Sequence, residues 1–160
     1  MNSVEAWREL IMIAIPSNKK RLFAMVCEIV KHTMKFSRFT GDLEEAMQTL
    51  CALLNGTGGM LLFGSMFADG VEGLQPADQI EREIAQAAER FKPPARVRFG
   101  RIRVGKDAEL LVAGVTRSRY VGPYTYAGCP YERAGRRTRK MKAGKFIEDT
   151  IYNLLMSLDS

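Results

Sequence analysis

A dense run of cations is the clearest sign of chemistry in this sequence. The run comprises Arg133, Arg136, Arg137, Arg139, Lys140, Lys142 and Lys145, and its tyrosine neighbours are Tyr120, Tyr124, Tyr126 and Tyr131. Guanidinium groups bind phosphates through paired hydrogen bonds, and tyrosine rings stack on unpaired bases. The segment therefore predicts a nucleic-acid interface.

A second set of arginines alternates with apolar residues over Arg96–Val104, a pattern typical of a β-strand. The phase changes at Gly100, which predicts a β-bulge there. The complete predicted interface is Arg101, Arg103, Tyr124, Tyr126, Arg133, Arg136, Arg137, Arg139, Lys140 and Lys142. The same charge would also suit a solvated loop that keeps the protein soluble, or a surface that binds acidic residues of a partner protein.

The overall charge also favours a polyanionic partner. The 160 residues contain 24 Lys and Arg against 18 Asp and Glu, a net charge of +6, which favours nucleic acid over an acidic protein or membrane surface. The cysteines Cys27, Cys51 and Cys129 form no disulfide framework, and His32 is the single histidine, so no zinc-site spacing is present. We expect no membrane segment or signal peptide and a cytoplasmic or nuclear location.

The elements that position these residues indicate an α/β or α+β fold, a mixed β-sheet with helices packed on it. Apolar spacing predicts helices from Asp42 to Leu54, over Pro76–Phe91 and over Phe146–Leu158. The last helix is expected to turn Ile147, Ile151, Leu154, Leu155 and Leu158 inward. The run Met60–Phe63 predicts a central strand covered on both faces, and Glu109–Thr116 and Pro130–Ala134 predict further strands. An N-terminal helix over residues 1–16 precedes the predicted domain at 17–160.

The glycine-rich centre of the chain resembles a known family. The sequence CALLNGTGGMLLFG at residues 51–64, followed by DGVEGL at 69–74, is similar to the signature of the Schlafen AlbA_2 domain. The sequence YERAGRRTR at residues 131–139 resembles the family's later motif, Y-x-R-x-G-S-x-T-R. The resemblance covers about Thr33–Arg139 and implies a strand over Thr33–Phe39 within a single Schlafen-like lobe.

In active family members, the resemblance implies a metal-assisted ribonuclease site built from three acidic residues. Carried over residue by residue, these positions fall on Val30, Lys35 and Met66, which offer no ligand for a divalent cation. The neighbouring carboxylates that could substitute are Glu28 and Asp69. We therefore predict that this chain binds no metal or other cofactor. Mg²⁺ or Mn²⁺ is expected only if the chain is an active nuclease, with Glu28 and Asp69 or with acidic residues from a partner.

Together these features predict a Schlafen-like RNA-binding or scaffold subunit, not itself catalytic, in an endoribonuclease assembly that acts on structured RNA or small-RNA precursors. The expected partners are RNA and other Schlafen-like chains, in a homo- or hetero-oligomer, because the resemblance implies paired lobes around a basic valley. Two alternatives stay open: an active metal-dependent endoribonuclease that works as a homo-oligomer, and a DNA- or chromatin-associated regulator.

Overall fold

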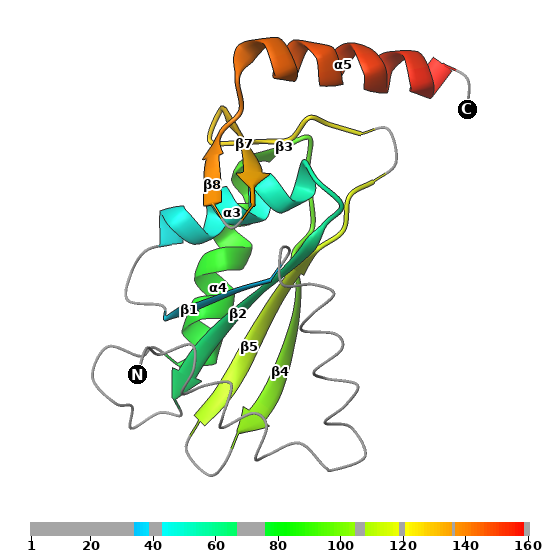
Figure 1. Cartoon of the computed structure of the whole chain (residues 1–160). Coiled ribbons are helices and arrows are strands. Elements are labelled where there is room, and N and C mark those ends of the chain that lie inside the picture. The colour runs from blue at the N-terminus through cyan, green and yellow to red at the C-terminus, as the bar shows by residue number, and fades with distance from the viewer. Residues whose placement is uncertain are drawn as a thin grey trace, which may run out of the picture.

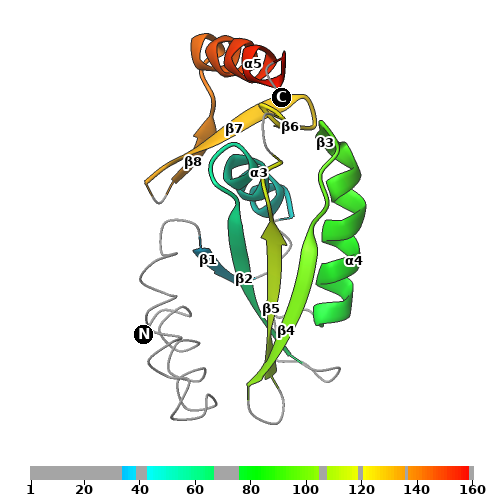
Figure 2. The ribbon, with the colours of Figure 1, turned by 90° about the vertical axis from the view of Figure 1, so that its right-hand side faces the viewer.

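Helix α3 (Leu43–Leu54) is the centre of the fold. The computed structural model describes residues 34–38, 43–66, 76–104, 108–118, 121–135 and 137–158, and in these residues α3 packs against both of two four-stranded sheets (Figures 1 and 2). The first sheet has the order β1-β2-β5-β4: β1 (Met34–Arg38), β2 (Gly59–Met66), β5 (Ala108–Val115) and β4 (Arg98–Val104). The second has the order β3-β6-β7-β8: β3 (Phe91–Lys92), β6 (Thr125–Tyr126), β7 (Cys129–Ala134) and β8 (Arg137–Lys140). The predicted α+β class is confirmed.

The first sheet has one face that is covered by helices. Strand β1 runs parallel to β2, and β2, β5 and β4 are antiparallel neighbours. Leu61 lies opposite Ala113 and Phe63 opposite Leu111, and all four side chains are buried on the same face. Met60, which points to the other face, is only half-buried. Strand β2 is therefore an internal strand, as predicted, but the predicted burial of both faces is not seen at Met60.

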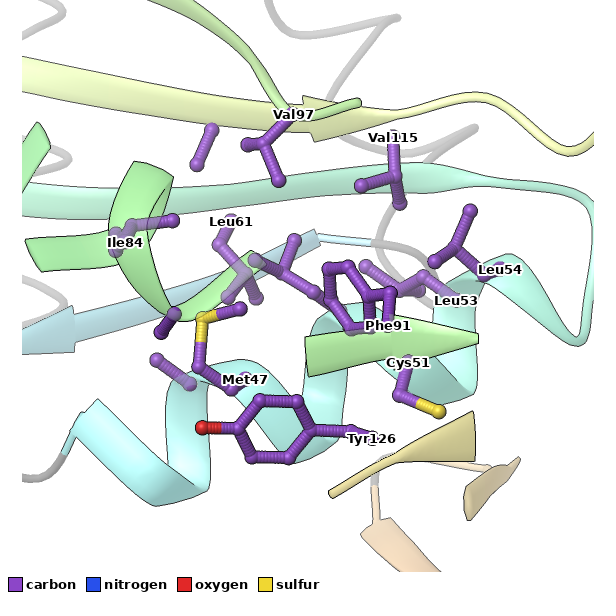
Figure 3. Packing of buried hydrophobic residues seen from close by; sticks show 14 of the residues in the cluster. Met47, Cys51, Leu53, Leu54, Leu61, Ile84, Phe91, Val97, Val115 and Tyr126 are labelled. Atoms are coloured by element: carbon purple, nitrogen blue, oxygen red, sulfur yellow. The ribbon is translucent and has the colours of Figure 1, made fainter. Parts of the chain in front are cut away.

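Two helices cover that face. Helix α4 (Ala77–Ala87), which continues into the 3-10 turn η1 (Ala88–Arg90), contributes the buried side chains of Ile80 and Ile84. Helix α3 is uncharged from Ala46 to Leu54 and is buried almost all round, as expected for a helix between two layers. Figure 3 shows Met47, Leu61 and Phe91 gathered in this core, with Tyr126 on the side of the second sheet.

The residue after α3 joins the helix to the second sheet. The Nδ2 amide of Asn55 donates hydrogen bonds to the backbone carbonyls of Tyr124 and Tyr131, both at 2.9 Å, and its Oδ1 accepts from the Tyr124 backbone N–H at 2.6 Å. Gly58 then turns the chain into β2 with a φ of +82°. A Cβ there would lie 2.7 Å from the Val115 carbonyl oxygen, so the turn requires glycine.

Partly polar side chains pack between α3 and the second sheet. The Tyr126 hydroxyl donates to the Glu44 carboxylate at 3.0 Å, and its ring packs edge-on against Phe91 at 5.7 Å between centroids. The Cys51 thiol donates to the Tyr124 carbonyl at 3.5 Å, and burial raises the pKa of this thiol to about 12. The thiol is therefore protonated and serves as a packing group.

The strands predicted from the sequence require correction at two points. The bulge predicted at Gly100 is wrong, because Arg98–Val104 pairs without interruption with β5. Regular alternation therefore puts Arg98 and Arg101 on opposite faces of β4, and these arginines do not line one common face. Strand β8 was not predicted at all. It pairs antiparallel with β7, so much of the basic run is part of a hairpin.

The C-terminal helix α5 (Ala143–Leu158) forms as predicted, but it faces the other way. The side chains predicted to point inward are more than half exposed: Ile147 57%, Ile151 52%, Leu154 61%, Leu155 58% and Leu158 79%. The buried residue on this helix is Asn153, whose Nδ2 donates to the Gly122 carbonyl at 3.2 Å and whose Oδ1 accepts from Arg117 at 3.5 Å. Helix α5 is therefore docked through a polar residue.

The start of α5 is also tied to the hairpin, through a buried carboxylate. Glu132 of β7 accepts a hydrogen bond from the Lys145 ammonium at 2.9 Å and one from Arg139 Nε at 3.3 Å. Lys145, and to a smaller extent Arg139, lower the pKa of Glu132 below its ordinary value, although burial of the carboxyl acts in the opposite direction.

The predicted helix at residues 1–16 lies outside the described residues. Within the ranges that the structure describes, no helix has both the length and the apolar character needed to cross a membrane.

Substitution of Asn55 should loosen the contact between α3 and the second sheet. Asn55→Ala leaves the Tyr124 N–H and two carbonyls without their partner, and we expect it to lower the free energy of unfolding by about 2–3 kcal/mol. Asn55→Asp should cost at least as much, because a carboxylate cannot donate to these carbonyls. Urea unfolding measures both. Thr57→Ala, exposed in the same turn, is the matched control and should stay within about 0.5 kcal/mol of the wild type. An Asn55→Ala variant as stable as the wild type would contradict this role.

Glu132→Gln should destabilise the protein in a pH-dependent way. Because the folded-state pKa of Glu132 is lowered, its contribution is complete above the ordinary glutamate pKa and is lost as the pH falls towards the folded-state value. We expect a loss of about 1–2 kcal/mol at pH 7, where Lys145 and Arg139 lose a charged acceptor. The loss should shrink below about pH 4, as the pH falls from the ordinary glutamate pKa towards the lowered folded-state value and the unfolded chain takes up a proton first. Urea unfolding at neutral and acid pH checks this, with Glu148→Gln on the exposed side of α5 as control. An equal loss at both pH values would refute the ionic contribution.

Candidate nucleic-acid interface

The hairpin of β7 and β8 forms one edge of the second sheet. Gly135, with a φ of +62°, begins its turn, and Arg133 lies opposite Thr138 in register. The Thr138 hydroxyl lies 3.0 Å from the Thr49 hydroxyl of α3 and accepts from Arg133 Nη1 at 2.9 Å, so this side of the hairpin faces the helix. Alternation then places Arg137 and Arg139 on the outer side.

The exposed cations of this region fall into two groups. Arg139 and Lys145 share the Glu132 carboxylate, which neutralises part of their charge. Arg137, Lys140 and Lys142 are exposed, and no carboxylate partner for them is found in the described part of the chain. We call these three residues the hairpin cations. They lie on an edge strand and just before the N-terminus of α5, whose unpaired N–H groups add positive partial charge.

Arg133 differs from its neighbours in the run, because it points to the inner side of the hairpin. Its Nε atom is buried without a hydrogen-bond partner among the described residues, and burial lowers the pKa of its guanidinium. It lines an open cavity of about 400 Å³ together with residues at the end of α3 and in the following turn. Its hydrogen bond to Thr138 joins the two strands of the hairpin on the side that faces α3, so Arg133 is not an outward phosphate contact.

The tyrosines do not provide the predicted stacking surface. Tyr124 and Tyr126 are each only 1% exposed, and Tyr131 is also buried. The prediction that Tyr124 and Tyr126 contact nucleic acid is therefore wrong, because their rings are part of the core below the second sheet. Arg90 covers the Tyr126 ring, with its guanidinium carbon 5.1 Å from the ring centroid.

The arginines of β4 lie elsewhere. Arg101 forms ion pairs with Asp78 and Glu81 of α4, the latter at 2.7 Å, and its hydrogen bonds to these carboxylates raise its pKa. In both views β4 lies at the opposite end of the molecule from the hairpin (Figures 1 and 2). Arg101 therefore does not join the hairpin cations, and the side chain of Arg103 lies outside the described part of the structure.

Several predicted residues cannot be placed by the structure. Arg136 and the candidate carboxylates Glu28 and Asp69 lie outside the described residues. Of the positions that the resemblance compares with catalytic acids, Lys35 lies in β1 and Met66 ends β2. In the ranges that the structure describes, no three His, Cys, Asp or Glu side chains come together in a possible metal site.

Glu132 and Asn55 are the important residues whose roles the sequence did not reveal. Glu132 is a single acid within a run of cations, which is the pattern expected of a shared counterion. Asn55 precedes a glycine turn, and such residues are common at helix ends, so nothing in its local sequence indicates its long-range bonds.

Comparison with known proteins agrees with the sequence motifs. The family described as "Schlafen, AlbA_2" matches residues 30–142. No curated protein matches the sequence. Among solved structures, the DIP2311 protein from Corynebacterium diphtheriae is similar with a TM-score of 0.49 and 15% identity, over 86% of this chain and 34% of that one. This chain thus spans about a third of the length of that protein.

The family match includes both the glycine turn after α3 and the β7–β8 hairpin, the two motifs that position the hairpin cations. It extends over well more than half of the residues. The chain belongs to the Schlafen AlbA_2 family.

Proposed function

We propose that this chain is an RNA-binding or scaffold subunit, not itself catalytic, of an endoribonuclease assembly that acts on structured RNA or small-RNA precursors. The observation that supports it most is the set of hairpin cations, exposed on an edge strand and just after it, without a carboxylate partner in the described residues. Membership of the Schlafen AlbA_2 family makes a nuclease setting plausible.

The arrangement suits the RNA backbone better than the bases. At about 3.3 Å per residue, Arg137 and Lys140 stand roughly 10 Å apart along β8 and on opposite faces of this edge strand, so a phosphate backbone can reach both of them only along its open edge. Arginine and lysine contacts to phosphate carry no sequence information. The buried rings of Tyr124 and Tyr126 offer no platform for unpaired bases. We therefore favour recognition of folded RNA by its shape and charge.

The non-catalytic role is supported by residue chemistry at the positions of the family acids. Valine and methionine provide no hard oxygen ligand, and the ammonium group of Lys35 repels a divalent cation. In an assembly, the acidic residues would come from another chain, while this chain would hold the substrate.

Substitution of the hairpin cations should weaken RNA binding more than substitution of the same number of exposed cations elsewhere on the chain. The triple variant Arg137→Gln, Lys140→Gln, Lys142→Gln should bind structured RNA at least about tenfold more weakly near 0.1 M salt, and its log K against log[salt] slope should be smaller by about 2–3. Fluorescence anisotropy over a salt series measures both. The matched control, Arg82→Gln, Arg96→Gln, Arg98→Gln, removes equally many exposed cations elsewhere and should retain most of the affinity.

Equal losses in the two triple variants would show that only net charge matters and would refute the hairpin interface. A parallel titration with duplex DNA of the same length tests the regulator alternative. Tighter binding of DNA than of RNA would contradict the proposed substrate class.

The isolated chain should bind structured RNA without cleaving it in the presence of Mg²⁺ or Mn²⁺. Gel analysis of a labelled hairpin RNA measures this, with intact binding by the same preparation as proof of folding. Cleavage that Glu28→Ala or Asp69→Ala abolishes would establish the active-nuclease alternative and overturn the non-catalytic role. Cleavage that neither variant affects would indicate a contaminating nuclease. To test for a contaminant, the wild-type chain is purified again until its specific cleavage activity is constant.

A further inference from the structure

Helix α5 presents an apolar stripe to solvent. Its members are Ile147, Ile151, Leu154, Leu155 and Leu158, all more than half exposed. The helix lies at one end of the molecule, beyond β7 and β8, in both views (Figures 1 and 2). No described helix or strand packs broadly against it. An apolar stripe of this kind marks an interaction surface.

The opposite side of the helix is already engaged. Asn153 is buried against Gly122 and Arg117, and Lys145 is held by Glu132. These polar contacts fix the rotation of α5, so the stripe cannot turn inward without breaking them. The family match ends at residue 142, immediately before the helix, so the stripe is not part of the matched family domain.

The spacing within the stripe is that of a helix-pairing seam. Ile147, Ile151, Leu154 and Leu158 follow one another at intervals of four, three and four residues, as the a and d positions of a heptad do. The set is also symmetric about a point between Tyr152 and Asn153. A second copy related by a two-fold axis would therefore set Ile147 against Leu158 and Ile151 against Leu154.

The size of the seam suits a weak dimer. Its four side chains, each more than half exposed, leave roughly 400 Å² of apolar surface on one helix, within the range of the largest patch on a typical monomer. Two copies together would bury about 800 Å² through these side chains, in the size range of weak and transient interfaces.

The charges of α5 favour the antiparallel arrangement of two copies. The charged residues Lys145, Glu148 and Asp149 all lie in the first half of the helix, and residues 150–158 carry no charge. In a parallel pair the two charged halves would lie side by side, and the two helix dipoles would point the same way. An antiparallel pair puts each charged half beside an uncharged one.

We propose that α5 mediates a homodimer, in which the stripes of two copies of this chain pair antiparallel about the point between Tyr152 and Asn153. The homodimer would supply a partner chain for the proposed scaffold role, and the inference rests on the proposed function only in that respect. Dimerisation is measured without RNA, and RNA binding through the hairpin cations, so the two proposals can fail separately.

The test compares charge substitutions at adjacent positions of the full-length chain. Ile151 and Tyr152 are 52% and 57% exposed, but only Ile151 lies in the seam. Sedimentation equilibrium of the wild type should give twice the 18.0 kDa of one chain. Ile151→Glu should weaken the dimer at least about tenfold, because the charge is buried on both sides of the two-fold axis. Tyr152→Glu should change the dissociation constant less than about threefold, since at about 100° per residue this side chain projects away from the seam.

A cysteine crosslink tests the orientation. Chains with Ile147→Cys mixed with chains with Leu158→Cys should give a disulfide-linked dimer on mild oxidation, while either variant alone should give only the wild-type background from the native cysteines. Crosslinking of each variant with itself would indicate a parallel pair and overturn the antiparallel seam.

A wild-type chain that stays monomeric up to about 100 μM overturns the homodimer. So does a dimer that survives Ile151→Glu, because its contact would then lie elsewhere. Circular dichroism spectra and melting temperatures equal to those of the wild type establish that each variant is folded.

Discussion

The arrangement of this chain depends on the side-chain amide of Asn55. The amide saturates three backbone groups in Tyr124 and Tyr131, which lie 69 and 76 residues further along the chain. It thereby links the end of a buried helix to the inner strands of the second sheet. Because a buried N–H or carbonyl without a partner is costly, this one residue fixes where the sheet can sit on α3. The position of the β7–β8 hairpin, and of its exposed charges, follows from that constraint.

The basic run shows how one short segment serves two purposes. Arg133 joins the two strands of the hairpin through Thr138, which itself contacts Thr49 of α3, and Arg139 and Lys145 surround the buried Glu132. These cations are part of the structure, and among the residues of the run that the structure describes, the hairpin cations are the ones that remain open to a polyanion. A count of positive residues therefore overstates the binding surface. The same internal pairing gives the surface a rigid base, because both strands and the start of α5 meet at Glu132.

The local elements could be predicted from the sequence, but several of their environments could not. Helices α3, α4 and α5 and strand β2 follow from strong apolar periodicity or from an uninterrupted apolar run. Strand β8 and the even pairing at Gly100 depend on hydrogen bonds to a second strand, which local patterns do not contain. Tyrosine fits both a core and a binding surface, so the burial of Tyr124 and Tyr126 is decided by tertiary contacts. Likewise, an apolar stripe on α5 predicts contact, but not whether the contact is within the chain.

The place of Cys51 in the layer between α3 and the second sheet has a further consequence. A protonated, enclosed thiol is inert towards alkylating reagents and oxidants, since the thiolate is the reactive form. Modification of this side chain requires the sheet to lift from the helix. The rate at which Cys51 reacts with a small alkylating agent therefore reports how often these two layers separate in the native protein, without any engineered label.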